Sequence, residues 1–201
     1  MYLFNKNWSE NQHVEIVGYK HPDFELPSNF TFYSMGEQGA DPSCFSGDLR
    51  KYFEKQDDWF VWLFEDSFIK GIDVDDLYWI NNYLLIDGVG RIDLGDQCIR
   101  GCNKPFIKYT GVYRYCYDRA YRLSTQPSIW RKEFLLKYLN PGLSPWDFER
   151  LHPVIDGWDI IGLDTKTLEY NEGVTKKDIF AYNLDGVPQD QINEMKQLGI
   201  L

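Results

Sequence analysis

The sequence has few of the features that mark membrane or exported proteins. No apolar run approaches the roughly 20 residues that a membrane-spanning helix needs. The first residues lack a basic segment followed by an apolar one, so we expect no secretory signal. Together these absences predict a cytoplasmic protein without a membrane span.

Cysteine and histidine, the usual ligands of zinc, are scarce and scattered. The four cysteines are Cys44, Cys98, Cys102 and Cys116, and the three histidines lie far apart. Cys98 and Cys102 are four residues apart, which is not the spacing of a strong zinc motif. Without an export signal, we expect the cysteines to be free thiols.

Positive charge is in deficit. Lysine and arginine number 21 against 31 aspartates and glutamates, which gives a net charge of −10. Such a surface repels phosphate backbones, so a large non-specific nucleic-acid footprint is excluded, although a local basic cleft is not. Aromatic residues make up 17% of the chain. They suit a ring-stacking site but equally an aromatic core, which is the default interpretation.

No repeat, low-complexity tract or long linker divides the chain, so residues 1–201 are expected to form a single domain. Strands and helices are predicted to alternate through the first half, which favours an α/β fold with a mostly parallel central sheet flanked by helices. The predicted strands cover residues 14–19, 29–35, 59–64, 89–94 and 112–123, with two more within 155–170. The predicted helices cover residues 48–55, the segment after 73–76, residues 128–139, a short segment from 144, and residues 189–198.

The first candidate site follows the apolar run Trp59–Phe64, which is predicted to be a strand buried on both faces. Glu65 and Asp66 come directly after it. In open α/β sheets, ligands bind beyond the carboxyl ends of strands. A divalent cation, Mn²⁺ or Mg²⁺, that bridges the phosphates of a nucleotide would suit two acids placed there. The alternative is that Asp66 or Ser67 caps the following segment.

The second candidate is the polar elbow between Tyr121 and Arg131. It contains Ser124 and Gln126 and is predicted to lead from a strand into a helix. Hydroxyl groups, an amide and free N–H groups at a helix start suit sugar hydroxyls or phosphate. The alternative is an ordinary helix cap.

The third candidate is the segment Ser144–Arg150. Ser144 is predicted to cap a helix that has Pro145 in its first position. Asp147 and Glu149 follow in the first turns, where an ionised carboxylate in a cleft could take a proton from an acceptor hydroxyl. Trp146 would offer a flat face to a sugar. The alternative is a capping acid beside a core tryptophan.

Together, in this order, the three segments resemble those of short GT-A-like glycosyltransferases found in phage genomes and in polysaccharide gene clusters. The motifs are the apolar strand ending in Glu65-Asp66-Ser67, the elbow with Gln126 before Ile129-Trp130-Arg131, and Pro145–Glu149. The resemblance covers roughly residues 8–201. In that family, a strand and a helix that hold the nucleotide base open the domain, whereas Met1–Phe4 looks like the end of that helix. The resemblance therefore implies that the N-terminal strand is missing here.

The resemblance implies an inverting transferase that uses a nucleotide-sugar donor, and UDP-sugars are the donors it favours. It places Glu65 and Asp66 where the family's metal motif lies, although Glu65-Asp66-Ser67 is not Asp-x-Asp. Glu149 or Asp147 would be the catalytic base. Donor or acceptor binding would fall to four residues, namely Ser124, Gln126, Arg131 and Trp146.

Other functions stay open at this point. The same acids would serve a metal-dependent nuclease, and a chain without the N-terminal strand would suit a non-catalytic nucleotide- or sugar-binding protein. A saccharide acceptor is favoured over DNA because of the acidic charge. Local support for DNA comes only from a cluster interleaved with tyrosines, namely Arg114, Arg119, Arg122, Arg131 and Lys132.

Overall fold

The computed structural model describes residues 1–39, 41, 43–64, 66–95, 103–106, 109–151, 155–172, 174–176, 179–181 and 184–199. Its helices are α1 (Tyr2–Asn7), α2 (Cys44–Phe53), α3 (Val74–Tyr83), α4 (Lys132–Tyr138), α5 (Pro145–Arg150) and α6 (Gln189–Gln197). Strands of the main sheet are β3 (Trp59–Trp62), β5 (Val89–Asp93), β6 (Asn103–Pro105), β7 (Val112–Tyr115), β8 (Ser128–Arg131) and β9 (Asp159–Leu163). The other strands are β1 (Val14–Gly18), β2 (Phe30–Ser34), β4 (Ser67–Ile72), β10 (Leu168–Glu172), β11 (Val174–Lys176) and β12 (Ile179–Ala181).

The central sheet has six strands in the order β3-β8-β5-β9-β7-β6. Strands β5 and β9 run parallel, whereas β3 with β8, β8 with β5, β9 with β7, and β7 with β6 pair antiparallel. The fold is therefore mixed α/β with a mostly antiparallel central sheet, and the expectation of a mostly parallel sheet is corrected. Alternation of elements predicted the class, but strand direction depends on which strands become neighbours.

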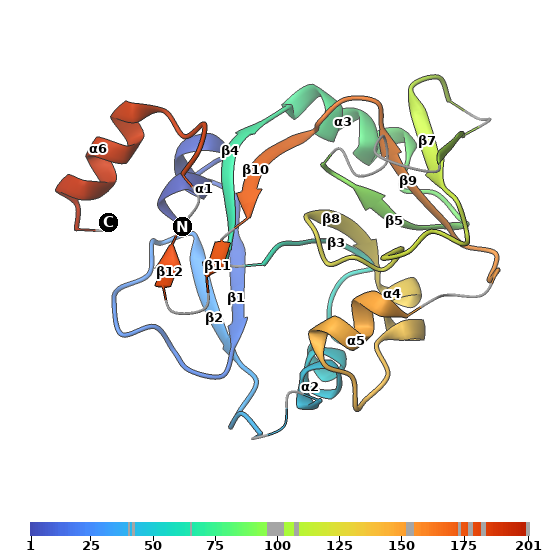
Figure 1. Ribbon diagram of the computed structural model, residues 1–201, viewed down its shortest axis with the longest axis horizontal. Coiled ribbons are helices and arrows are strands. Elements are labelled where there is room, and N and C mark those ends of the chain that lie inside the picture. The colour runs from blue at the N-terminus through green and yellow to red at the C-terminus, as the bar shows by residue number, and fades with distance from the viewer. Residues whose placement is uncertain are drawn as a thin grey trace.

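Helices cover both faces of this sheet (Figure 1), with α2, α4 and α5 on one side and α3 on the other. Adjacent residues of a strand point to opposite faces. Trp130 of β8 accordingly packs in the cluster with Phe134 of α4 and Phe148 of α5, while Ile129 packs in the cluster with Ile80 of α3. Two apolar cores, one on each face, hold the sheet in place.

The predicted helix over residues 128–139 is wrong in its first part and confirmed in its second. Ser128–Arg131 is strand β8, and the helix begins only at Lys132. Ile129 and Trp130 were expected on one helical face, yet they serve opposite cores. Pairing with both β3 and β5 selects the strand. The polar elbow therefore leads into a strand, and the expected helix N-terminus at this point is absent.

The apolar run at Trp59 is also placed differently than expected. Strand β3 ends the described order of the sheet and pairs with β8. Val61 is 41% exposed, so the strand is not buried on both faces. After it the chain turns into β4, a strand that the sequence pattern did not predict and that pairs with β10. The acids after Phe64 thus follow an edge strand.

Helix α4 packs closely on β5 because Gly90 has no side chain. A Cβ atom at Gly90 would lie 2.3 Å from Cγ of Phe134, which no side chain could occupy. Helix α3 begins at its predicted place, since the Asp73 carboxylate accepts a hydrogen bond from the N–H of Asp76. Among the described residues, no helix has both the length and the apolar character of a membrane span.

Candidate functional site

A single cleft brings together the three segments that the sequence singled out. Its volume is about 580 Å³. Strand β3's end and the start of β4 contribute Phe64, Asp66 and Ser67. The connection between β7 and β8 contributes Tyr115, Arg119, Ala120, Tyr121, Ser124, Thr125, Gln126 and Pro127, and α5 contributes Pro145, Trp146 and Glu149.

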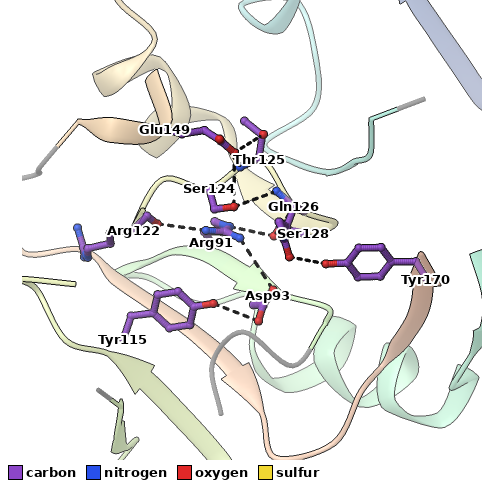
Figure 2. Close-up of polar contacts among 10 residues, drawn as sticks. All are labelled: Arg91, Asp93, Tyr115, Arg122, Ser124, Thr125, Gln126, Ser128, Glu149 and Tyr170. Carbon is purple, nitrogen blue, oxygen red and sulfur yellow. Dashed lines mark hydrogen bonds and ion pairs between the residues drawn. The ribbon is translucent and has the colours of Figure 1, made fainter. Parts of the chain in front are cut away.

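The elbow before β8 rests on a buried arginine (Figure 2). Arg91 of β5 donates from Nε to Ser128 Oγ at 2.9 Å and from Nη1 to the Arg122 carbonyl at 3.1 Å. It therefore ties both ends of the elbow to the sheet. The Asp93 carboxylate lies 3.9 Å from Arg91 Nη2, and both side chains are fully buried. Removing one of two buried, oppositely charged groups such as Arg91 and Asp93 is costly. Arg91 is therefore held in place, and with it the elbow to which it donates.

A second arginine, Arg122, anchors the start of the elbow. Its Nη2 donates to the Trp158 carbonyl at 2.6 Å, and Nη1 lies 3.9 Å from Asp156. Burial lowers the pKa of the Arg122 guanidinium, and the nearby Asp156 carboxylate opposes that shift. Arg122 is fully buried, so it serves the framework of the cleft and not its surface.

Glu149 is held in one orientation by the elbow (Figure 2). Its Oε1 accepts hydrogen bonds from the Thr125 N–H at 2.7 Å and the Thr125 hydroxyl at 2.6 Å. The Ser124 hydroxyl donates to the same oxygen at 3.5 Å. All three donors reach Oε1, which leaves Oε2 as the oxygen that can meet a ligand. A carboxylate fixed through one oxygen and presented to a cleft is suited to proton transfer.

Local sequence explains why helix α5 presents Glu149 in this way. Ser144 and Asp147 form a reciprocal capping box, and Pro145 follows the cap, as the sequence predicted. Trp146 and Glu149 are three residues apart, a spacing that places both on one side of the helix. Both line the cleft.

Asp147, the alternative base, is engaged elsewhere. Its Oδ2 accepts from the Ser144 hydroxyl at 2.6 Å and from the Ser144 N–H at 3.2 Å. These hydrogen bonds lower the pKa of the Asp147 carboxyl. The side chain is exposed and is not part of the cleft lining, so the structure gives it the role of a cap.

Of the predicted metal pair, Asp66 is exposed and lines the cleft, while Glu65 lies outside the described residues. In the described part of the chain, no three Asp, Glu, His or Cys side chains are grouped to hold a metal ion. Mg²⁺ is commonly bound through one or two carboxylates together with substrate phosphates. A metal site at Asp66 therefore stays a prediction.

Gln126 and Ser124 line the cleft, whereas Arg131 is not among its lining residues. The Gln126 amide oxygen accepts a hydrogen bond from the Tyr170 hydroxyl, which comes from β10. Arg131 lies 3.0 Å from Asp87 and faces the rings of Trp59 and Trp158. Gln126 precedes β8 and Arg131 is the last residue of that strand, so an extended strand and not a helical turn separates the two residues.

Three arginines of the basic cluster that offered local support for DNA are paired with acids or buried. Arg114 pairs with Asp159 at 3.3 Å, Arg122 is buried, and Arg131 pairs with Asp87. Among these arginines, Arg119 lines the cleft. Its guanidinium carbon lies 4.1 Å from the ring centroid of Tyr115, whose hydroxyl donates to Asp93.

Sequence reasoning did not assign a role in this cleft to Thr125, Tyr121, Arg119 or Tyr170. Thr125 and Tyr121 lay within the elbow motif, and Arg119 lay within the basic, tyrosine-rich stretch. No local signal pointed to Tyr170, which reaches Gln126 from 44 residues away.

The expectation of four free thiols is wrong for at least one cysteine. Cys116 is disulfide-bonded, whereas Cys44 is free. Cys98 and Cys102 lie outside the described residues.

Comparison with known proteins adds no family assignment. No protein-family model matches the chain, and no curated protein matches it significantly in sequence. Function is therefore argued from the cleft itself.

Proposed function

We propose that this chain is a glycosyltransferase that moves a sugar from a nucleotide-sugar donor to a hydroxyl acceptor. The observation that carries the proposal is the convergence of Asp66, Gln126 and Glu149 on one cleft that also has aromatic walls. Aromatic faces beside hydroxyl, amide and carboxylate groups match a sugar, which has an apolar C–H face and polar edges.

Glu149 is the base of the proposed reaction. Its free Oε2 takes the proton of the acceptor hydroxyl, while Thr125 holds Oε1. The acceptor oxygen forms a bond to the anomeric carbon of the donor as the bond from that carbon to the diphosphate oxygen breaks. The electron pair leaves with the nucleoside diphosphate, and the anomeric configuration is inverted.

Asp66 and Arg119 are the charged groups we assign to the donor side. Asp66 would hold a divalent cation, Mn²⁺ or Mg²⁺, which supplies charge neutralisation to the donor diphosphate when bound. Arg119 lines the same cleft, and a guanidinium can donate two parallel hydrogen bonds to a phosphate. A UDP-sugar is the first donor to test.

The acceptor we propose is a saccharide. The net charge of −10 disfavours the phosphate contacts that supply most duplex affinity. A duplex base would also have to be flipped out of the stack, at a cost of a few kcal/mol. Arg114 and Arg131 are engaged in ion pairs and Arg122 is buried, which weakens the local support for a nucleic-acid groove.

Calorimetry and donor hydrolysis test the proposal. The full chain would be titrated with UDP-glucose, UDP-galactose and UDP-N-acetylglucosamine, in Mn²⁺ and in EDTA, and released UDP would be measured with and without saccharide acceptors. Binding with slow hydrolysis that acceptor accelerates is the expected result. Binding without turnover would instead support a non-catalytic binding protein, and cleavage of a nucleic-acid probe would support a nuclease.

A further inference from the structure

Two large aromatic side chains of the cleft are turned toward solvent. Trp146 is 61% exposed and Tyr121 is 54% exposed, and both line the cleft. They come from different elements, since Trp146 lies in α5 and Tyr121 in the loop between β7 and β8. Exposed rings that share a concave surface are suited to contact a ligand.

The backbone at Tyr121 is strained. Its φ angle is +55°, and among the described residues it is the single residue other than glycine with a positive φ. A bulky side chain disfavours this left-handed region, which glycine or asparagine would occupy at lower cost. Its carbonyl accepts a hydrogen bond from the Ser124 N–H at 3.0 Å, which closes the turn before the elbow. A residue that keeps its ring despite such strain often serves a ligand site.

The position of Trp146 decides which substrate would contact it. Trp146 and Glu149 lie one turn apart on the same side of α5. A ring stacked on Trp146 therefore lies beside the carboxylate that removes the proton. Asp66, on the donor side, comes from a different segment of the cleft lining.

We infer that Trp146 and Tyr121 form an acceptor subsite that binds a pyranose ring of a saccharide. The inference rests on the proposed function and adds the residues that contact the saccharide acceptor. The apolar C–H face of the sugar packs on the aromatic rings, and the sugar hydroxyls contact Ser124 and Glu149 of the cleft lining. Trp146 and Tyr121 carry out no chemistry; they orient the acceptor hydroxyl that reacts.

Saccharide binding by matched variants tests the subsite. The full chain, Trp146→Ala, Tyr121→Asn and Tyr78→Ala would be applied to an array of plant, bacterial and animal oligosaccharides that also carries hydroxymethylated duplex DNA. Tyr78 is 71% exposed on α3, outside the cleft lining, and serves as the control. We expect wild type and Tyr78→Ala to bind the same saccharides. Trp146→Ala should bind them about tenfold more weakly, as loss of one stacked ring implies.

Thermal unfolding separates a ligand role from a structural one at Tyr121. Asparagine tolerates the left-handed backbone, so Tyr121→Asn should unfold at the same temperature as wild type or higher while binding saccharide more weakly. Tyr121→Phe keeps the ring and should keep the binding.

Three outcomes would overturn the subsite: no saccharide bound by wild type, unchanged saccharide binding by Trp146→Ala, or binding of the DNA probe alone. If the proposed function were wrong, the result would differ: the wild type would hydrolyse no UDP-sugar, while saccharide binding could still be observed. Saccharide binding lost in Trp146→Ala, with no hydrolysis of any UDP-sugar by wild type, would leave the subsite intact in a protein that is not a transferase.

Discussion

The two sides of the cleft are built differently. On the side of the elbow and α5, Thr125 and Ser128 are buried, Glu149 accepts three hydrogen bonds, and Arg91 ties the backbone to the sheet. On the other side, Asp66 is exposed and follows edge strand β3. Under the proposed function, Glu149 is held in place before substrate binds, whereas the side of Asp66 would be completed by a ligand.

The position of each side in the sheet explains this contrast. Strand β8 has a neighbour on each side, β3 and β5, so the elbow that enters it is fixed by two ladders. Strand β3 pairs with β8 and ends the described order, and the chain after it leaves this sheet to pair with β10 as β4. Preorganised groups contribute most where charge develops in the transition state, which is the role proposed for Glu149.

The largest expected effect is on the preorganised side, at the base itself. Glu149→Gln keeps the shape and the acceptor oxygen for Thr125 but loses the basicity. Turnover should fall by about 10²–10⁴-fold, with UDP-sugar affinity little changed. Initial rates and calorimetry measure the two quantities. Asp147→Asn is the control, and a large loss there with little loss in Glu149→Gln would move the base to Asp147.

Removal of the buried arginine beneath the elbow should come next in size. Arg91→Met removes the cation beside the buried Asp93 carboxylate, at a cost of about 3–5 kcal/mol in the free energy of unfolding. Urea denaturation measures it. Arg131→Met is the matched control, because Arg131 pairs with the exposed Asp87 and its loss should cost about 0–1 kcal/mol. Equal losses in the two variants would mean that buried Arg91 contributes no more to stability than Arg131 does.

Thr125 tests whether the orientation of the base matters. Thr125→Val removes the hydroxyl that donates to Glu149 Oε1 and keeps the N–H donor. A hydrogen bond to a charged group contributes about 1.5–3 kcal/mol, so turnover should fall by roughly 10–100-fold. Thr125→Ser restores the hydroxyl and should recover most of the rate. If the serine variant were as slow as the valine variant, packing and not orientation would be responsible.

On the ligand-completed side, Asp66→Ala should affect binding more than fold. The variant should unfold like wild type, because the side chain is exposed. It should bind UDP equally in Mn²⁺ and in EDTA, since water replaces a carboxylate ligand poorly. Calorimetry in the two buffers measures the difference. A variant that kept the Mn²⁺-dependent gain of wild type would remove Asp66 from the metal site.

The smallest effect is expected at Asp147, which caps α5 beneath the base. The pKa of Asp147 is lowered in the folded state by hydrogen bonds from Ser144, so its carboxylate adds stability above the unfolded pKa of about 3.9. That stability is lost as the pH falls through the lowered pKa. The melting temperature of Asp147→Asn should therefore lie slightly below wild type at neutral pH and converge with it in acid. A gap that widened in acid would contradict the capping role.

Local signals in the sequence identified several elements correctly. Ser144-Pro145 and Asp73 marked the starts of α5 and α3, and α6 was placed within a residue. These predictions succeed because a cap is made by residues within three or four positions of each other. Asp66, Gln126 and Glu149 all line one cleft, and their proposed roles there stay predictions.

Other features depended on contacts between distant segments. Residues 128–131 carry apolar side chains that fit a helix, yet pairing with β3 and β5 makes them a strand and removes Arg131 from the site. The same pairings decide that the sheet is mostly antiparallel. Local preference for helix or strand amounts to less than about 1 kcal/mol per residue, so tertiary pairing overrides it.

The sequence by itself determined the mixed α/β class, the capped helices and the residue types of the site, because each depends on composition or on near neighbours. Only the tertiary structure decided that Glu149 and not Asp147 lines the cleft, that Thr125 holds Glu149, and that Tyr121 lies in a strained turn. Those facts depend on hydrogen bonds between residues more than twenty positions apart, or on backbone angles fixed by packing, which no local pattern records.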